Sequence, residues 1–166
     1  HYYPVKPIRE LLIALPQIDQ QMSRDGASMV IVGSGDAGIE LAFAFRTRFG
    51  GAACVTLISK RPFEADAALS AAAKAIRRVL VDRGITCIES QAVVEAAADS
   101  VVLSDGRSVA ADVICAATTV HPPDWILDSA LPTEQGFLAV NDFLQVQNQS
   151  ALFAAGDILS PASPRG

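Results

Sequence analysis

In the first half of the chain, short continuous apolar runs alternate with longer segments in which apolar residues recur at helical spacing. A strand-length run is followed by a helix-like segment twice, and a third apolar run closes the series. The predicted strands span residues 29–32, 52–59 and 85–89, and the predicted helices between them span residues 37–49 and 65–83. This alternation predicts a parallel sheet with right-handed crossovers.

The ends and faces of these segments carry further signals. Gly50 and Gly51 are predicted to end the first helix, and Gly84 to end the second. The strand 52–59 is almost continuously apolar, which is typical of a strand covered on both faces. The second helix has one apolar face, formed by Leu69, Ala73, Ile76 and Leu80.

A shorter helix is predicted before the first strand. Pro7 stands at its start, where a missing backbone N–H is tolerated, and Pro16 is predicted to stop it after Leu15. Residues 17–28 are polar and are predicted to form a connector.

The pattern changes after position 90, where apolar runs follow one another without intervening helices. Residues 92–98, 100–104 and 108–117 are predicted to form an antiparallel three-stranded meander, with Asp105-Gly106 as a hairpin turn. After residue 119 the chain is irregular until a last apolar run at 151–155. We therefore expect an entry helix and connector at 1–28, a central domain at 29–119 and a separate C-terminal segment at 120–166.

Composition excludes several classes of protein. The 166 residues are 51% hydrophobic with a formal net charge of −5, which argues against a nucleic-acid-binding surface. No apolar run reaches the ~18–20 residues of a transmembrane helix, and no signal-peptide pattern is present at the start. Cys54, Cys87 and Cys115 have neither redox nor zinc spacing, so no metal site is expected. The odd cysteine count favours a reducing, cytoplasmic location.

The segment between the first strand and the first helix carries the candidate chemistry. Gly33, Gly35 and Gly38 form a Gly-x-Gly-x-x-Gly pattern that allows a tight turn, close approach of a pyrophosphate and close helix packing. N–H groups at the helix start would bind the phosphates. The pattern predicts a dinucleotide site that includes Ser34, Asp36 and Ala37, although a glycine-rich turn that binds nothing is the alternative.

The residues after the second strand bear on which nucleotide binds. NAD sites place an Asp or Glu there to bind the ribose 2′-hydroxyl. This chain has Ser59, Lys60 and Arg61 instead, and no carboxylate before Glu64. Lys60 and Arg61 would attract a 2′-phosphate and Ser59 could donate to either ribose, which favours NADP(H) over NAD(H). The alternative is that the two cations are ordinary solvated loop charges.

Together these residues resemble the two-dinucleotide-binding flavoproteins, the pyridine nucleotide-disulphide oxidoreductases. Residues 30–42 resemble the family's Gly-x-Gly-x-x-Gly-x-Glu site, and residues 92–117 its meander. Ala117-Thr118 resembles the start of its Ala-Thr-Gly exit motif, and Phe153-Ala-Ala-Gly-Asp157 its second FAD motif. Four further segments resemble type II NADH dehydrogenase-like modules, especially those fused to selenide, water dikinase: residues 5–8, 125–127, 136–140 and 143–145.

The resemblance implies an NAD(P)H-binding domain that passes hydride to FAD, and from there to an electron acceptor that the sequence does not identify. It places Glu40 near the nicotinamide, Thr118 in the exit motif as a cofactor-binding residue, and Asp157 at the flavin ribityl chain. An acidic residue that favours the helix dipole is the alternative for Glu40. No catalytic side chain is required, because the cofactors supply the redox chemistry.

The chain also departs from the family pattern. Thr119 replaces the exit-motif glycine, no redox dithiol is present, and the first glycine motif of the FAD domain is absent. We therefore expect a fragment of a larger flavoprotein that binds a nicotinamide dinucleotide but not FAD by itself. His121, beside two prolines, is expected to be a loop residue. A non-catalytic nucleotide-sensing or docking module, or a scaffold without a ligand, are the alternatives.

Overall fold

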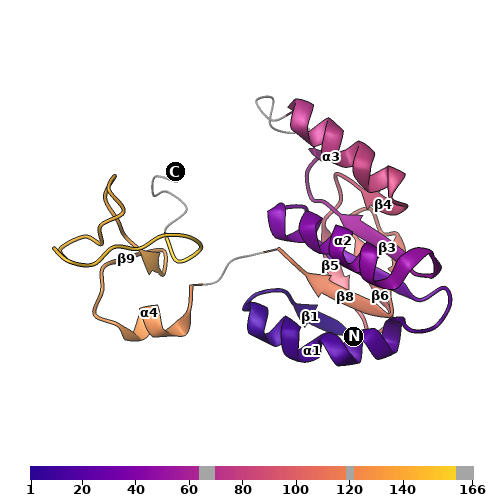
Figure 1. Cartoon of the computed structure of the whole chain (residues 1–166), viewed down its shortest axis with the longest axis horizontal. Helices are drawn as coiled ribbons and strands as arrows, with labels where there is room; N and C mark the ends of the chain where they lie inside the picture. Colours follow the sequence, from indigo (N-terminus) through magenta and orange to yellow (C-terminus); the bar gives the residue numbers. More distant parts are fainter. Residues whose placement is uncertain (64–69, 119–121, 160–166) are drawn as a thin grey trace. The chain divides into compact units, whose positions relative to one another are not determined.

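The computed structural model describes residues 1–63, 70–118 and 122–159, and it divides into two units, His1–Thr118 and Thr119–Gly166 (Figure 1). The first unit is built on a five-stranded sheet whose neighbouring strands all run parallel. In spatial order the strands are β1 (Tyr2–Pro4), β8 (Val113–Ala116), β2 (Ser28–Val32), β3 (Cys54–Ile58) and β4 (Ile85–Ile88).

Three helices pack on one face of this sheet: α1 (Ile8–Met22), α2 (Asp36–Phe49) and α3 (Ser70–Asp82). Alternate strand positions such as Met29 and Ile31 point toward these helices, as the two-residue period of a strand requires. The helices contribute fully buried or nearly buried side chains to this core, among them Leu11, Ile18, Ala42, Phe45 and Leu80.

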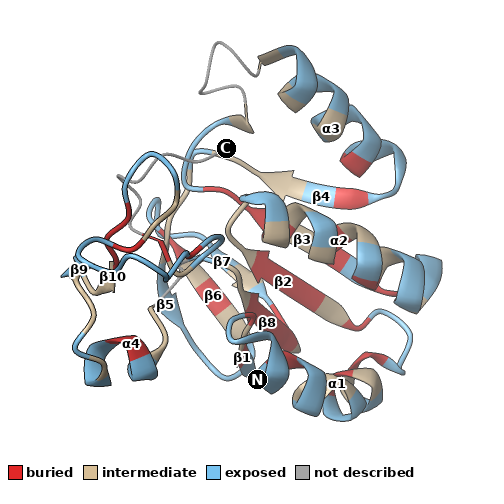
Figure 2. Ribbon diagram, turned by 60° about the vertical axis from the view of Figure 1, so that its left-hand side comes forward, coloured by how far each residue is buried: buried red, intermediate tan, exposed pale blue. Residues whose placement is uncertain are grey.

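The opposite face is covered by the meander of β5 (Val93–Ala96), β6 (Ser100–Leu103) and β7 (Ser108–Ala110). Val30 and Ile58, the strand neighbours of residues on the helix face, pack here against Val101 and Leu103. The sheet is therefore covered on both sides, which explains the continuous apolar sequence of β3 (Figure 2). The predicted α/β class, with a parallel sheet, flanking helices and a three-stranded meander, is confirmed.

Most predicted elements of the first unit occur within a few residues of their predicted ends. α2 ends where Gly50 adopts φ +64, and α3 ends before Gly84 at φ +72. Gly106 at φ +85 forms the turn of the hairpin between β6 and β7. The first part of the second predicted helix, including Leu69, lies outside the described residues.

The predicted stop at Pro16 is wrong, because α1 runs through it to Met22. Proline removes one backbone donor, whose partner would be the carbonyl of Leu12 four residues earlier. Both Pro16 and Leu12 are exposed, so water can hydrate that carbonyl. Ile18 and Met22 lie on the buried side of the helix, and their burial favours continuing it. The predicted connector at 17–28 is therefore helix in its first half.

The strand predicted at 108–117 is in fact two strands that belong to different sheets. Its first part, β7, pairs with β6, whereas its second part, β8, enters the parallel sheet between β1 and β2. The three-residue strand β1 was not predicted from the sequence at all. It extends the parallel sheet by pairing with β8, in the register Tyr2 to Ile114.

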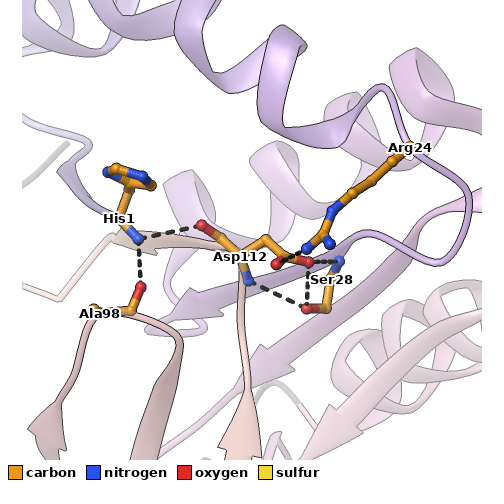
Figure 3. A network of polar contacts seen from close by, with 5 residues as sticks. All are labelled: His1, Arg24, Ser28, Ala98 and Asp112. Carbon is orange, nitrogen blue, oxygen red and sulfur yellow. Dashed lines mark hydrogen bonds and ion pairs between the residues drawn. The ribbon is translucent and has the colours of Figure 1, made fainter.

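Asp112 lies at the break between these two strands (Figure 3). Its carboxylate accepts hydrogen bonds from the backbone N–H and hydroxyl of Ser28, at 2.8 and 3.0 Å, and forms an ion pair with Arg24. The α-amino group of His1 donates to the carbonyl oxygens of Asp112 and Ala98, at 3.2 and 2.9 Å. These bonds hold the chain against the start of β2, so that the next residues pair with β2 instead of continuing the meander.

The second unit contains little regular structure, namely α4 (Asp124–Asp128) and a hairpin of β9 (Thr133–Glu134) and β10 (Phe137–Leu138). Its small core consists of Ile126, Leu138, Val140, Val146, Ala154 and Leu159. In the apolar run at 151–155, Phe153 is 62% exposed and makes a single bridge to Gln145. Across the described part of both units, no helix combines the length and apolar character needed to cross a membrane.

Candidate dinucleotide-binding site

The turn from β2 into α2 lies at the carboxyl edge of the parallel sheet. Gly33 has φ +107, a conformation that L side chains rarely adopt, and its N–H donates to the carbonyl of Ile58 at 2.9 Å. A Cβ atom on residue 33 would also lie 2.5 Å from the carbonyl oxygen of Ala117. Gly33 is therefore required by both the backbone conformation and the close passage of the chain after β8.

The other two glycines of the pattern have different surroundings. A Cβ atom on Gly38 would overlap the carbonyl oxygen of Gly33 and lie 2.9 Å from its carbonyl carbon. A Cβ atom on Gly35 would meet nothing within 4 Å. The packing of the fold thus explains why residues 33 and 38 are glycine. It does not explain why residue 35 is glycine, because the space beside Gly35 is open.

Helix α2 begins immediately after Gly35, and no side chain caps its first turn. The leading N–H groups of a helix have no partner within the helix, and they attract anions together with the helix dipole. Here they sit beside the open space at Gly35, because Gly35 is the residue that precedes the helix. This combination of exposed backbone donors and missing side-chain bulk fits a pyrophosphate group.

A cleft of about 750 Å³ opens beside this turn. Its polar end is formed by the turn between β2 and α2 (residues 33–36, the glycine loop) and by the segment that follows β3. Its apolar end is formed by Phe63 and the first half of α3. The predicted site residues that line it are Gly33, Ser34, Gly35, Asp36, Ser59, Lys60, Arg61 and Thr118. Residues distant in sequence therefore meet at one edge of the sheet, as expected for parallel strands.

Ser59 occupies the end of β3, where an NAD site has its carboxylate, and its side chain is buried. Its hydroxyl lies 2.5 Å from the hydroxyl of Ser34 and 2.5 Å from the carbonyl oxygen of Arg61. A carbonyl can only accept, so Ser59 donates to Arg61 and Ser34 donates to Ser59. The serine thus joins the glycine loop to the loop after β3.

Lys60 and Arg61 are exposed at the mouth of the cleft. The segment that carries them is held again at Phe63, whose backbone N–H donates to the carboxylate of Glu89 at 2.9 Å. Glu89 also accepts from Arg77 of α3 at 2.6 Å. Two cationic side chains therefore extend from a loop that is fixed at both ends.

Comparison with known proteins assigns this arrangement to a family, since residues 11–165 match the pyridine nucleotide-disulphide oxidoreductases. The chain belongs to that family. An NADH dehydrogenase-like protein of Mycobacterium tuberculosis (strain CDC 1551 / Oshkosh) is 31% identical over 145 residues, which cover 80% of this chain and 35% of the relative. Ferroptosis suppressor protein 1 of Xenopus tropicalis is 29% identical over 143 residues, which cover 78% of this chain and 38% of the relative.

The fold is also shared with a solved structure, that of an NAD-dependent persulfide reductase from A. fulgidus. The two agree with a TM-score of 0.71 at 20% identity, over 95% of this chain and 29% of the other. At this identity the likeness concerns the fold alone. This member of the pyridine nucleotide-disulphide oxidoreductase family spans somewhat more than a third of the curated relatives that it matches.

Four predicted site residues of this family member lie elsewhere. Gly38 is buried under the glycine turn, and Asp157 belongs to the second unit. Ala37 and Glu40 line another hollow of about 310 Å³, together with Val5, Lys6, Ile8, Leu41 and Ala44. Thr119 and His121 lie outside the described residues.

The sequence interpretation missed the apolar end of the cleft. Phe63 and Ala72 were assigned no role there, and Ala73 and Ile76 were assigned only to the apolar face of a helix. The available signal is the run Ser70-Ala-Ala-Ala73, because small side chains on a helix that follows a site-bearing loop leave room for a ligand.

The three cysteines of the chain differ in burial, and none of them forms a disulfide. Burial raises the pKa of Cys115 to about 12, and burial together with the nearby charge of Glu89 raises the pKa of Cys87. Cys54 is exposed, and the three thiols are all free. Among the described residues, no group of three His, Cys, Asp or Glu side chains could hold a metal ion.

Proposed function

We propose that this chain is the NAD(P)H-binding part of an FAD-dependent oxidoreductase that passes hydride from a nicotinamide cofactor to flavin. The observation that carries the proposal is the contrast among the three glycines. Gly33 and Gly38 lack space for a side chain, whereas Gly35 faces an open cleft at an uncapped helix start. A turn with only a folding role would have no need for glycine at position 35.

The cleft suggests how the nucleotide lies. The pyrophosphate would accept hydrogen bonds from the backbone N–H groups at Gly35, Asp36 and Ala37, beside Ser34. The adenosine half would extend toward the loop after β3. Its base would pack among the apolar side chains of Phe63, Ala73 and Ile76. Asp36 contributes its backbone, because its carboxylate would repel the phosphates.

Lys60 and Arg61 favour NADP(H). A 2′-phosphate carries negative charge and several acceptor oxygens, which cationic side chains bind by charge-assisted hydrogen bonds. Both side chains are exposed at the cleft, and no carboxylate lines the cleft near them in the described part of the chain except that of Asp36. An acidic residue at the end of β3 would reverse this preference.

The nicotinamide half would lie near Thr118, which lines the cleft, and by the family resemblance near Glu40, which lines the second hollow and not the cleft. A bound nicotinamide supplies the hydride. Asp157 would contact the ribityl chain of FAD when the rest of the FAD-binding domain, which we propose as the partner of this chain, is present. Gly156 precedes it at φ +82, and the turn is closed by a hydrogen bond from the N–H of Leu159 to the carbonyl of Gly156. The electron acceptor is a separate molecule of unidentified class.

Two finer assignments rest on the sequence, the first on the family resemblance and the second on the odd cysteine count. The whole protein would be a type II NADH dehydrogenase-like module of the kind fused to selenide, water dikinase, and it would act in the cytoplasm. Recovery of the full reading frame tests the first, because a fused kinase or a second glycine motif would be visible at once, and a targeting segment in it would contradict the second.

The binding proposal is tested with calorimetric titration of the chain with NADPH and NADH. Gly35→Ala should fold normally, because its methyl group meets no atom within 4 Å, yet it should weaken nucleotide binding about tenfold or more. Gly51→Ala is the matched control, since its new Cβ atom meets only Arg46 at 3.9 Å and lies outside the cleft. Absence of binding by the unaltered chain would refute the proposal. Binding without dye reduction by the full-length protein would favour a sensing module.

A further inference from the structure

The backbone and hydroxyl of Ser59 are already satisfied within the chain. Its N–H donates to the carbonyl of Ile88 at 2.8 Å, and its carbonyl accepts from the N–H of Gln91 at 3.0 Å. Its hydroxyl hydrogen goes to the carbonyl of Arg61. The residue is 3% exposed. A serine has one hydroxyl hydrogen, so Ser59 has none left to donate to a ribose while this arrangement persists.

The same bonds give Ser34 a defined orientation. Because Ser59 donates to Arg61, the hydrogen of Ser34 must point toward Ser59. The oxygen of Ser34 therefore presents its two lone pairs and not a hydrogen to any other neighbour. Ser34 lines the cleft within the glycine loop, so the orientation of a cleft-lining group depends on a buried residue at the end of β3.

Ser59 also fixes the backbone of the loop that follows β3. This loop carries Lys60 and Arg61 and is called the basic loop below. The carbonyl of Arg61 is held at one end of this loop, and Glu89 holds the N–H of Phe63 at the other. Lys60 and Arg61 form no ion pair with a carboxylate of the described residues, so within that part of the chain the loop backbone is what positions their side chains. Movement of the loop would change the distance between these cations and a 2′-phosphate.

We propose that Ser59 is a positioning residue that sets the preference between NADPH and NADH without touching the nucleotide. It does so by holding the glycine loop, through Ser34, and the basic loop, through the carbonyl of Arg61, at a fixed separation. The inference rests on the proposed function, since it assigns a role within the same cleft. Recognition of the 2′-phosphate then belongs to Lys60 and Arg61.

The test compares Ser59→Ala, Ser59→Thr and Ser34→Ala with the unaltered chain by calorimetric titration with NADPH, NADH, 2′,5′-ADP and 5′-AMP. Ser59→Ala should lower affinity for the two ligands with a 2′-phosphate about five- to tenfold more than for the two without it, as loss of a well-placed hydrogen bond allows. Ser59→Thr keeps the hydroxyl and should restore the unaltered ratio. The effects of Ser34→Ala and Ser59→Ala should be less than additive in the double variant, because both remove the Ser34–Ser59 bond, although Ser59→Ala also removes the bond to Arg61.

The outcomes separate this inference from the proposed function. If the unaltered chain binds neither dinucleotide, both are overturned. If it binds and Ser59→Ala weakens all four ligands equally, Ser59 is a direct ligand of the shared ribose and the positioning role is wrong. An unchanged ratio in every variant also overturns it. Thermal melting checks folding. If Ser59→Ala does not fold, Ser34→Ala still tests the link between the two loops, because it removes the Ser34–Ser59 bond and keeps the bond to Arg61, and an unchanged NADPH/NADH ratio in Ser34→Ala then overturns the positioning role.

Discussion

The carbonyl oxygen of Gly33 occupies the place where a side chain of residue 38 would begin. The first turn of α2 therefore packs directly on the backbone of the turn that precedes it. Backbone cannot move aside as a flexible side chain can, so this contact fixes the approach of the helix to the sheet.

Gly38→Ala should consequently destabilise the first unit. Forcing a methyl group against the Gly33 carbonyl should reduce the free energy of unfolding by about 1–3 kcal/mol, as overpacking commonly does. Urea denaturation followed by circular dichroism measures this, with Gly51→Ala as the control. Equal midpoints for the two variants would show that the helix start moves freely.

Lys60→Ala and Arg61→Ala should each lower NADPH affinity by about ten- to a hundredfold, the effect expected of a lost charge-assisted hydrogen bond. NADH affinity should change by less than about threefold, because NADH lacks the 2′-phosphate. The NADPH effect should shrink at high salt. Arg9→Ala removes an exposed cation that does not line the cleft and is the control. Equal losses for the two nucleotides would contradict the assignment.

The ion pair between Asp19 of α1 and Arg48 of α2 should contribute to stability only above acidic pH. Two hydrogen bonds of 2.6 Å from the Arg48 guanidinium hold the pKa of Asp19 below its ordinary value of 3.8, against the opposing effect of slight burial. A group with a lowered folded-state pKa stabilises above its unfolded pKa and loses that contribution as the pH falls through the folded value.

Asp19→Asn should therefore be less stable than the unaltered chain at pH 7, and the difference should shrink as the pH falls below 3.8 and through the lowered pKa of Asp19. The effect at pH 7 is expected to be small because both side chains are substantially exposed. Urea midpoints at a series of pH values measure it, and Asp25→Asn, an exposed carboxylate of the loop after α1, is the control. A difference that persists in acid would assign the effect to packing.

Thiol labelling of the native chain should distinguish the three cysteines. Cys54 is exposed and should react with iodoacetamide at pH 8, whereas Cys115, fully buried with a pKa of about 12, should react only after unfolding. Cys87 should react at an intermediate rate, because burial and Glu89 raise its pKa. Peptide mass spectrometry over time gives the order, and early modification of Cys115 would indicate opening of the central sheet.

The elements that the sequence predicts correctly are those with strong local signals. α2 lies between two glycine turns, and β3 combines β-branched residues with a continuous apolar run. The glycine loop and the loop after β3 could be joined into one site because parallel strands bring their carboxyl ends to the same edge.

What could not be predicted depends on contacts between distant residues. α1 continues past Pro16 because Ile18 is buried in a core that only the assembled sheet creates. Ser59 appears in the sequence as a ligand candidate, and only its partners at Ser34 and Arg61 reveal that its hydroxyl is engaged. The break at Asp112 likewise depends on Ser28, which lies 84 residues away.

The position of β8 between β1 and β2 has a consequence for synthesis. β8 is the last strand of the first unit to leave the ribosome, yet it forms the centre of three strands and pairs Tyr2 with Ile114. Until it emerges, β2 has an open edge and β1 has no neighbour to pair with. At ~5–20 residues per second this interval lasts several seconds, during which the edge of β2 presents unpaired N–H and C=O groups that a chaperone can shield.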